Sequence, residues 1–395
     1  MNTLNFTLPA EWEPQSMVQL TWPHEKTDWA EMLDDVCACF IAIAREVTKR
    51  EHLLVVTPHP VRVEEQLRKA GINMEHVTLH ECPTNDTWAR DHGFITVRSN
   101  GPRVTSDEVV QDLNKEYRRQ KCRSVDNGSD YDKQGDQMQT VHSAELLHSC
   151  TPELKVFLDF CFNGWGMKFA SNHDNQINRS LYNAGLLKGK YVDCLDFVLE
   201  GGSIESDGAG TLLTTSHCLL APNRNARYLT KEAFEEKFRQ CFGTRQVLWL
   251  DHGYLAGDDT DSHVDTLARL CPNDTIAYVQ CTDKADEHYT ELHLMEEQLK
   301  SFRTLDGRPY QLVPLPMTDA IVREGERLPA TYANFLIMND AVLYPTYNQP
   351  EKDALAKEQL QRIFPHREVV GIDCCALIRQ HGSLHCVTMQ YISDK

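Results

Sequence analysis

The chain has no long hydrophobic run and no segment typical of export. None of its apolar stretches approaches the roughly 20 residues that a helix needs to cross a bilayer. Its first residues lack the basic stretch followed by an apolar stretch that marks a secretory signal. We therefore expect a cytoplasmic protein with no membrane partner.

Basic residues are scarce relative to acidic ones. The 395 residues include 40 Lys and Arg against 58 Asp and Glu, which gives a formal net charge of −18 at pH 7. Nucleic-acid binding depends on clustered Lys and Arg that replace the counterions of the phosphates, so we expect no nucleic-acid partner. The charge favours a small cationic molecule as partner, although acidity also serves to keep a protein in solution.

Paired-cysteine motifs are absent, although the chain has 14 cysteines. They are scattered, and neither Cys37 with Cys39 nor the adjacent Cys374 and Cys375 has the CxxC spacing of a metal or redox site. This pattern excludes the disulfide framework of a small secreted domain. We interpret most of the cysteines as small buried hydrophobic residues in a reducing compartment.

Short β-type runs alternate with amphipathic helical patterns, which indicates a mixed α/β protein. Strand patterns fall at 17–22, 53–57, 94–97, 247–250, 275–279 and 341–344, and helical patterns at 29–50, 61–70, 231–241, 287–302 and 351–363. The recurrence of strand and helix fits an internally repeated architecture. A polar stretch at about 102–152 breaks the alternation, and we expect it to be a surface insertion.

Cys386 lies near the C-terminus in an alternating run, 384–389, that predicts a strand beginning just after Gly382. Its thiol would then lie at a strand end beside a flexible turn, next to His385. A single cysteine in such a place is either a core residue or a nucleophile.

The segment 257–265 places four carboxylates and one histidine within nine residues. So many hard oxygen ligands would suit a metal-dependent hydrolase, but the segment lacks the pattern of a calcium loop and of an HExxH zinc helix. In a second interpretation, His263 and Asp265 project to one side of an extended segment and serve one pocket. The histidine would act there as acid and base, and the carboxylate would bind positive charge. A solvated acidic turn is the third interpretation.

Trp88 and Asp91 form a candidate cradle for a planar cation. The indole face attracts a cation, and a carboxylate can accept two parallel N–H bonds from it. Glu200 directly follows an apolar run and precedes two glycines, which permit close approach of another group. Each of these residues also has a structural interpretation, as core packing or as a local ion pair.

Five motifs together resemble the agmatine deiminase family, which also contains bacterial peptidyl-arginine deiminases. They lie at 84–91, 162–166, 200–203, 259–265 and 384–388. The resemblance covers nearly the whole chain outside the polar stretch. It implies the pentein fold, a five-bladed α/β propeller with pseudo-fivefold symmetry, with residues 1–395 as a single catalytic domain.

The resemblance also implies roles for eight side chains. Cys386 would be the nucleophile, His263 the general acid and base, and Asp91 and Asp265 the carboxylates that hold a guanidinium. Glu200 would contact the substrate or orient His263. Substrate binding would involve Trp88, Asp259 and Asn334, with Asp258 as an alternative to Asp259.

The implied reaction is hydrolysis of agmatine to N-carbamoylputrescine and ammonia, a step of polyamine synthesis, through a covalent thiouronium on Cys386. It requires neither a metal nor another cofactor, and a small cationic guanidine is the expected partner. Deimination of peptidyl-arginine or of another guanidine, and polyamine binding without catalysis, are the alternatives. Two departures from the family's common pattern, at 381–383 and at Glu205, are expected to change the pocket. The sequence leaves a homo-oligomer open.

Overall fold

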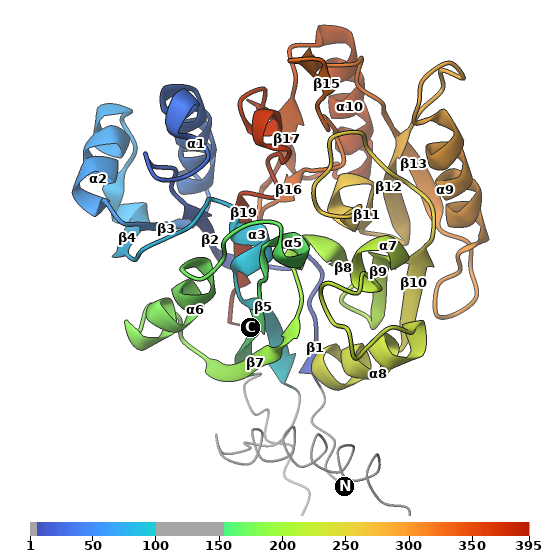
Figure 1. Ribbon diagram of the computed structural model, residues 1–395, viewed down its shortest axis with the longest axis horizontal. Coiled ribbons are helices and arrows are strands. Elements are labelled where there is room, and N and C mark those ends of the chain that lie inside the picture. The colour runs from blue at the N-terminus through green and yellow to red at the C-terminus, as the bar shows by residue number, and fades with distance from the viewer. Residues whose placement is uncertain (1–5, 100–153, 395) are drawn as a thin grey trace, which may run out of the picture.

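The structure is a computed structural model that describes residues 6–99 and 154–394 (Figure 1). The predicted insertion at about 102–152 lies outside the described residues. Within them, the chain forms a mixed α/β fold with five sheets of three or four strands and one small hairpin. In strand order the sheets are β19 (Thr388–Ile392), β2 (Gln15–Thr21), β3 (His52–Thr57) and β4 (Val77–Glu81); β1 (Phe6–Thr7), β5 (Ile95–Ser99), β6 (Leu154–Cys161) and β7 (Lys190–Val198); β10 (Gln246–Leu250), β9 (Thr211–Thr215) and β8 (Ile204–Ser206); β11 (Ala268–Cys271), β12 (Thr275–Gln280) and β13 (Gln311–Pro316); and β16 (Leu336–Ile337), β17 (Ala341–Thr346) and β18 (Glu368–Asp373), with the hairpin formed by β14 (Val322–Arg323) and β15 (Glu326–Arg327).

The five sheets share one pattern of strand pairing. In each, an antiparallel pair is extended by a parallel strand, as where β8 pairs antiparallel with β9 and β9 pairs parallel with β10. A parallel neighbour requires a crossover connection, and a helix lies in each of these crossovers. The first sheet joins the C-terminal strand β19 to the second strand of the chain, because β19 pairs antiparallel with β2.

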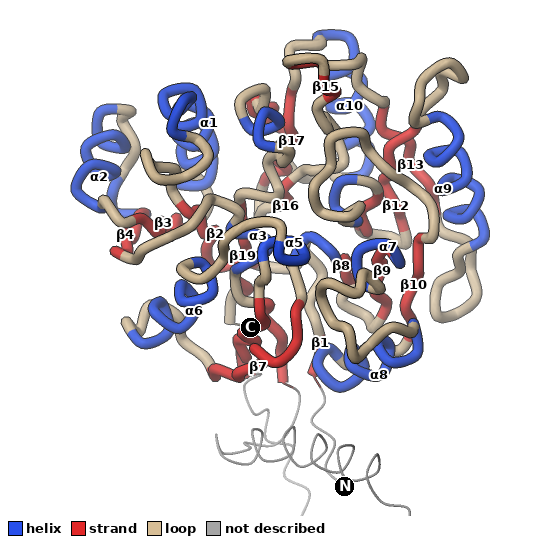
Figure 2. Tube along the Cα trace, viewed as in Figure 1, coloured by secondary structure: helices blue, strands red, loops and turns tan. Residues whose placement is uncertain are grey.

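The crossover helices lie at the periphery of the molecule, while the strands and several short helices lie nearer its centre (Figures 1 and 2). The longer helices are α1 (Leu33–Thr48), α2 (Pro60–Lys69), α6 (Asp174–Asn183), α8 (Lys231–Phe242), α9 (Tyr289–Ser301) and α10 (Pro350–Ile363), and the short ones are α3 (Ala89–His92), α5 (Gly164–Met167) and α7 (Ser216–Leu219). None of the helices in the described ranges combines the length and the apolar character that a membrane crossing requires.

Helix α8 illustrates how the sequence sets these elements. The Thr230 side chain accepts a hydrogen bond from the Ala233 amide and so caps the first turn. Phe234 and Phe238, four residues apart, bury one face against the second and third sheets. Gly243 ends the helix in the left-handed region, with φ of 67°, which a glycine adopts without steric cost.

The predicted elements are confirmed with small shifts of their ends. Every predicted strand pattern coincides with a strand, and every predicted helical pattern contains a helix. The largest shift is at the start of α1, where residues Ala30–Met32 form a 3₁₀ turn before the α-helix begins at Leu33. Tight turns of this kind are common at helix ends.

The predicted start of the strand around Cys386 is wrong. β19 begins at Thr388, and the preceding residues form a turn. The backbone amide of His385 donates to Asn334, and the Thr388 amide donates back to the His385 carbonyl at 3.0 Å. These contacts take the place of ladder hydrogen bonds, so the cysteine lies in a turn directly before the strand.

Candidate active site

Five short segments meet at the centre of the molecule, each directly before a strand of a different sheet. Helix α3 (Ala89–His92) precedes β5, the 3₁₀ turn η3 (Gly201–Ser203) precedes β8, and η4 (Val264–Thr266) precedes β11. The segments that carry Asn334 and Cys386 precede β16 and β19. Because α3 contacts η3 and η3 contacts η4, residues far apart in the sequence lie side by side.

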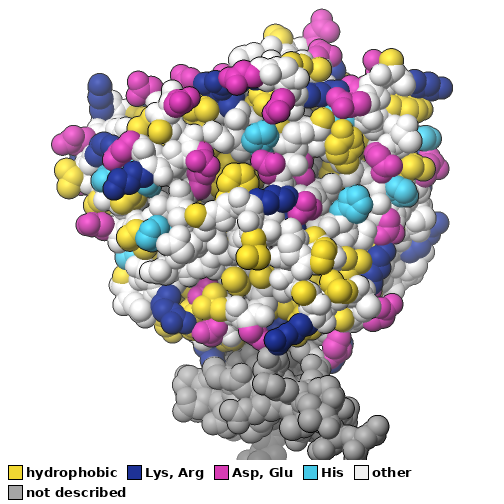
Figure 3. Space-filling view, viewed as in Figure 1, with side chains coloured by type: hydrophobic (Ala, Val, Ile, Leu, Met, Phe, Trp, Pro, Cys, Tyr) yellow, Lys and Arg dark blue, Asp and Glu magenta, His cyan; other side chains and the backbone are white. Residues whose placement is uncertain are grey.

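A pocket at this centre is lined by Trp88, Asp91, Trp165 and Cys386, among others. The ring centroids of Trp88 and Trp165 are 6.2 Å apart in an edge-to-face arrangement, so two indoles form part of the wall. Gly382 lies against the Trp88 indole, where a Cβ would come within 2.1 Å of the ring. Hydrophobic and acidic side chains adjoin near the middle of the face seen in Figure 3.

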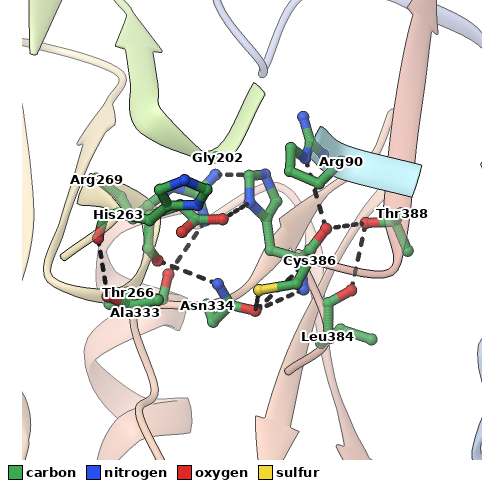
Figure 4. A network of polar contacts seen from close by, with 12 residues as sticks. Arg90, Gly202, His263, Thr266, Arg269, Ala333, Asn334, Leu384, Cys386 and Thr388 are labelled. Atoms are coloured by element: carbon green, nitrogen blue, oxygen red, sulfur yellow. Dashed lines mark hydrogen bonds and ion pairs between the residues drawn. The ribbon is translucent and has the colours of Figure 1, made fainter. Parts of the chain in front are cut away.

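The Cys386 thiol is buried and hydrogen-bonded to Asn334 (Figure 4). Its Sγ lies 3.3 Å from Asn334 Oδ1, which also accepts the His385 amide at 2.9 Å. Asn334 Nδ2 donates to the Asp265 carbonyl at 3.3 Å. Burial raises the pKa of Cys386 well above its ordinary value, and the charges of Asp265 and Asp91 raise it further. The thiol therefore keeps its proton until another charge changes its surroundings.

His263 lies between two carboxylates. Its Nε2 is 3.2 Å from Glu200 Oε2, and its Nδ1 is 3.7 Å from Asp91 Oδ1. Burial acts to lower the pKa of His263, but the Asp91 charge and the contact with Glu200 outweigh it and raise the pKa well above its ordinary value. The imidazole is therefore a proton donor in the resting site.

Glu200 binds Arg224 in addition to His263. The Arg224 Nε donates to both carboxylate oxygens, at 3.0 and 2.8 Å, and both side chains are buried. Burial raises the pKa of Glu200, yet the hydrogen bond from His263 and the Arg224 charge outweigh it and lower the pKa below its usual value. Glu200 therefore stays ionised beside the imidazole.

Asp91 and Asp265 are the two carboxylates whose charges raise the pKa of the Cys386 thiol. Asp91 accepts the Trp165 indole N–H at 2.9 Å and the Gly202 amide at 3.0 Å. Burial and the charges of Asp265 and Glu200 raise the pKa of Asp91 to about 6, against the opposing effect of the nearby imidazole. Asp265 Oδ2 contacts His385 Nδ1 at 2.7 Å. Burial acts to raise the pKa of Asp265, but the hydrogen bond and charge of His385 lower it below its usual value.

Gly202 keeps an open space between these groups. A Cβ at this position would lie 2.7 Å from His263 Nδ1, 3.0 Å from Asp91 Oδ1 and 3.1 Å from Asp265 Oδ2. Within the described residues, His263 Nδ1 and Asp265 Oδ1 are buried and have no hydrogen-bond partner. Buried polar atoms are rarely left unpaired, so the site has room and unmet hydrogen-bonding capacity for a ligand with several N–H donors.

Three further carboxylates line the same pocket, those of Asp28, Asp86 and Asp259. Of the charged side chains that the structure describes, no Lys or Arg pairs with them, and only His381 approaches Asp259, at 3.9 Å. Burial and the charge of Asp28 raise the pKa of Asp86 to about 7. Asp28 and Asp259, together with Asp86 when it is ionised, therefore give the pocket a negative lining that includes neither Lys nor Arg among the described residues.

Among the described residues, one of the three groups that could hold a metal ion adjoins the pocket directly: the atoms of Glu200, Cys218 and His263 lie within 4.8 Å of one another. The carboxylate of this group already binds the Arg224 guanidinium. A cation placed there would have to displace that positive charge.

Comparison with known proteins identifies the family. The sequence profile described as Porphyromonas-type peptidyl-arginine deiminase matches residues 7–391. The chain belongs to this family. Its members are hydrolases that act on carbon–nitrogen bonds of guanidino groups. A Porphyromonas gingivalis protein provisionally named an arginine deiminase is 45% identical over 98% of each chain, with a TM-score of 0.80.

Agmatine deiminases are also similar to this chain over nearly its full length. The Campylobacter jejuni agmatine deiminase, solved as a cysteine-to-serine variant with substrate bound, is 32% identical, covers 98% of this chain and 97% of its own, and has a TM-score of 0.79. A Marinomonas protein provisionally named an agmatine deiminase is 29% identical over 98% of this chain and 94% of its own.

The eight site residues predicted from the deiminase resemblance all lie in or beside the pocket. The pocket is lined by Trp88, Asp91, Asp259 and Cys386, and directly behind it lie Glu200, His263, Asp265 and Asn334. Their chemical roles stay predictions. Asp258 does not line the pocket, because its carboxylate accepts hydrogen bonds from Thr260 and Ser262 and so forms a turn.

Two other expectations are changed by the geometry of the deiminase site. Glu205 does not line the pocket, because its carboxylate is buried against the Arg269 guanidinium. The acidic segment at 257–265 does not converge on one point: Asp261 pairs with Arg224 and Lys168, whereas Asp265 faces His385. This divergence is poor geometry for a shared metal ion.

Trp165 and Arg224 contact site carboxylates but received no role in the sequence analysis. A signal for Trp165 exists, since it lies in one of the family motifs between Gly164 and Gly166, and all three residues have positive φ. That conformation turns the indole N–H toward Asp91. Arg224 lies in a loop without a motif, so only the fold brings it to Glu200.

Proposed function

We propose that the protein is an agmatine deiminase, which converts agmatine and water to N-carbamoylputrescine and ammonia. The observation that carries the proposal is the set of carboxylates lining the pocket, Asp28, Asp86 and Asp259, none of which pairs with a Lys or Arg among the described side chains. Agmatine has a guanidinium at one end and an ammonium at the other. Inner carboxylates would bind the first cation, and these outer ones would attract the second. Free arginine would need a basic group for its carboxylate, and the described lining includes neither Lys nor Arg.

The guanidinium would lie in the space beside Gly202. Its N–H groups would donate to Asp91 and to Asp265 Oδ1, which has no protein partner. Carboxylates on opposite sides localise the delocalised positive charge and make the central carbon more electrophilic. The Trp88 and Trp165 rings would pack against the cation and its carbon chain.

The substrate would also activate the nucleophile. A cation between Asp91 and Asp265 offsets the two charges that help to raise the pKa of Cys386, so the thiol releases its proton to solvent. The thiolate then adds to the guanidinium carbon and forms a carbon–sulfur bond. Imidazolium His263 gives a proton to one nitrogen, the carbon–nitrogen bond breaks, and ammonia leaves a cationic thiouronium.

Hydrolysis would use the same imidazole in reverse. Neutral His263 takes a proton from water, whose oxygen adds to the thiouronium carbon. Collapse of this adduct breaks the carbon–sulfur bond, returns the Cys386 thiolate and gives the ureido product. The second water proton passes to solvent and protonates the released ammonia, so one water is consumed in each cycle.

The same proposal extends to the architecture. The five sheets share one pairing pattern, and one of the five central segments precedes a strand of each sheet. Both features support a pentein fold with five blades and pseudo-fivefold symmetry. Residues 1–395 would then be one catalytic domain.

Ammonia release from agmatine, free arginine and N-acetyl-arginine amide tests the substrate. We expect agmatine to have the highest kcat/KM, and Asp86→Asn to lower kcat/KM for agmatine more than for the blocked arginine, which lacks the second cation. Equal turnover of the blocked arginine would instead favour a peptidyl-arginine deiminase, the activity that names the family.

The nucleophile is tested by Cys386→Ala with Cys375→Ala as its control, a half-buried cysteine outside this pocket. We expect Cys386→Ala to abolish ammonia release and Cys375→Ala to leave it unchanged. Wild-type turnover by Cys386→Ala would refute the covalent mechanism.

A further inference from the structure

A second cavity lies beside the pocket, and no residue lines both. Two pairs of consecutive residues are divided between them. Asp91 and Cys386 line the substrate pocket, whereas Arg90 and His385 line the second cavity. The backbone links the two pairs, because the Arg90 amide donates to the Cys386 carbonyl at 3.2 Å. His385 is therefore adjacent to the nucleophile in the chain but has no access to the substrate.

His385 joins the site to a buried charge network through both ring nitrogens. Nδ1 is 2.7 Å from Asp265 Oδ2, and Nε2 is 2.9 Å from Glu11 Oε2. Arg269 Nη2 lies 3.2 Å from the same Nε2 and also pairs with Glu11. Only 1% of the ring surface is exposed. The charged groups around the ring are Glu11, Arg90, Glu205, Asp265 and Arg269.

An ionised carboxylate only accepts hydrogen bonds, so the short contact with Asp265 requires that His385 Nδ1 carry the proton. This hydrogen bond occupies Asp265 Oδ2 and leaves Oδ1 as the oxygen without a protein partner. Glu11 and Arg269 hold the far side of the ring and prevent its rotation.

We propose that His385 is a positioning residue, which fixes the Asp265 carboxylate in its charged form with Oδ1 turned toward the guanidinium. The proposal rests on the proposed function, because it assumes that Asp265 binds the substrate cation. His385 acts through Asp265 and touches no reacting atom. This role requires a side chain with hydrogen-bonding nitrogens on two opposite edges, which an apolar residue lacks.

Two substitutions at His385 test the two ring nitrogens separately. In His385→Asn the amide nitrogen replaces Nδ1 and can still donate to Asp265. In His385→Gln the amide nitrogen reaches toward Glu11 in place of Nε2, and the bond to Asp265 is lost. The variants are similar in polarity and size, so a purely structural role would impair both alike.

We expect His385→Gln to lower kcat/KM for agmatine about 10- to 100-fold, the usual effect of losing a hydrogen bond to a charged group. The acid limb of its pH profile should move to higher pH, because the loss of the His385 donor raises the pKa of Asp265, which must be ionised. We expect His385→Asn to retain an activity and an acid limb close to those of the wild type. Equal impairment of both variants, or an unmoved acid limb in His385→Gln, would overturn the proposal.

Binding of methylguanidinium to the Cys386→Ala protein, measured by calorimetry at several pH values, keeps this test independent of turnover. Adding His385→Gln should weaken binding and shift its pH dependence upward, and adding His385→Asn should not. Wild-type protein that releases no ammonia from agmatine would refute the proposed substrate, while the calorimetry would still decide the role of His385. Unchanged methylguanidinium binding in both double variants would exclude it.

Discussion

Gly202→Ala should block the candidate active site by adding a single methyl group. The added Cβ would lie 2.7 Å from His263 Nδ1, 3.0 Å from Asp91 Oδ1 and 3.1 Å from Asp265 Oδ2. Attractive contacts to carbon are optimal at about 3.5–4.0 Å, so these polar atoms would have to move apart by up to about 1 Å. The backbone of Gly202 is not in the left-handed region, so the effect arises from the side chain rather than from backbone strain.

The expected loss of activity can be set against the expected loss of stability. A displacement of about 1 Å at a reacting centre can cost about 10²-fold in rate, and the methyl would also fill space proposed for the guanidinium. Overpacking of a buried position costs about 1–3 kcal/mol of unfolding free energy. We therefore expect Gly202→Ala to fold, to melt at a lower temperature than the wild type, and to lose at least about 10²-fold in kcat/KM for agmatine.

Gly371→Ala is the matched control. A Cβ at Gly371 in β18 would lie 2.8 Å from Thr346 Cγ2, a similar overlap outside the pocket. Thermal unfolding and ammonia release should be measured on both variants. We expect Gly371→Ala to lower the melting temperature but not kcat/KM. If Gly202→Ala were as active as Gly371→Ala, the guanidinium would not lie at the point where His263, Asp91 and Asp265 converge.

Three other substitutions test the electrostatics. Trp165→Phe removes the N–H donor to Asp91 and should raise the pKa of Asp91 above about 6. The acid limb of the kcat/KM profile should therefore move to higher pH, and an unmoved limb would contradict a role of Trp165 in keeping Asp91 ionised. Arg224→Met removes the guanidinium that pairs with buried Glu200 and leaves His263 as its remaining cationic partner. It should lower the free energy of unfolding by up to about 3–5 kcal/mol in urea titrations, and a smaller loss than for Arg179→Met, which breaks an exposed ion pair, would refute this role. Burial raises the pKa of Glu51 to about 6, so ionisation of this carboxyl destabilises the fold at higher pH. In urea titrations, Glu51→Gln should be up to about 2 kcal/mol more stable than the wild type at pH 8. This advantage should vanish below about pH 4.5, where the carboxyl is protonated in both the folded and the unfolded protein.

The regular elements could be predicted because their signals are local. Helix α8 has its cap, its buried face and its terminating glycine within fourteen residues, from Thr230 to Gly243, and each acts through neighbours in the chain. The turn at Cys386 could not be predicted in this way. The alternating pattern there is compatible with a strand, and only the distant Asn334 decides which partner the backbone amides take.

The candidate site was predictable only as a set of residue types. The family motifs point to the carboxylates, the histidine and the cysteine, but they contain no information on distances. Glu205 shows the limit: its place after the double glycine suggested a pocket residue, whereas the alternation of sides along β8 directs it toward Arg269. Arg224 shows the converse, because it has no motif and yet holds Glu200.

The charge balance of the site connects substrate binding with product release. Three buried carboxylates, Asp91, Glu200 and Asp265, lie around the imidazolium of His263, and the Arg224 guanidinium is shared between Glu200 and Asp261. Carboxylates therefore outnumber cations around the imidazole when all of them are ionised. In the proposed reaction, a bound guanidinium would balance that excess and favour the thiolate of Cys386. The ureido group of the proposed product would be neutral, so the inner carboxylates would no longer attract that end of the molecule, whereas its ammonium would still be drawn to the outer carboxylates. The excess negative charge would again favour the protonated thiol. The inner carboxylates, which would draw in the guanidinium, would therefore not retain the ureido group.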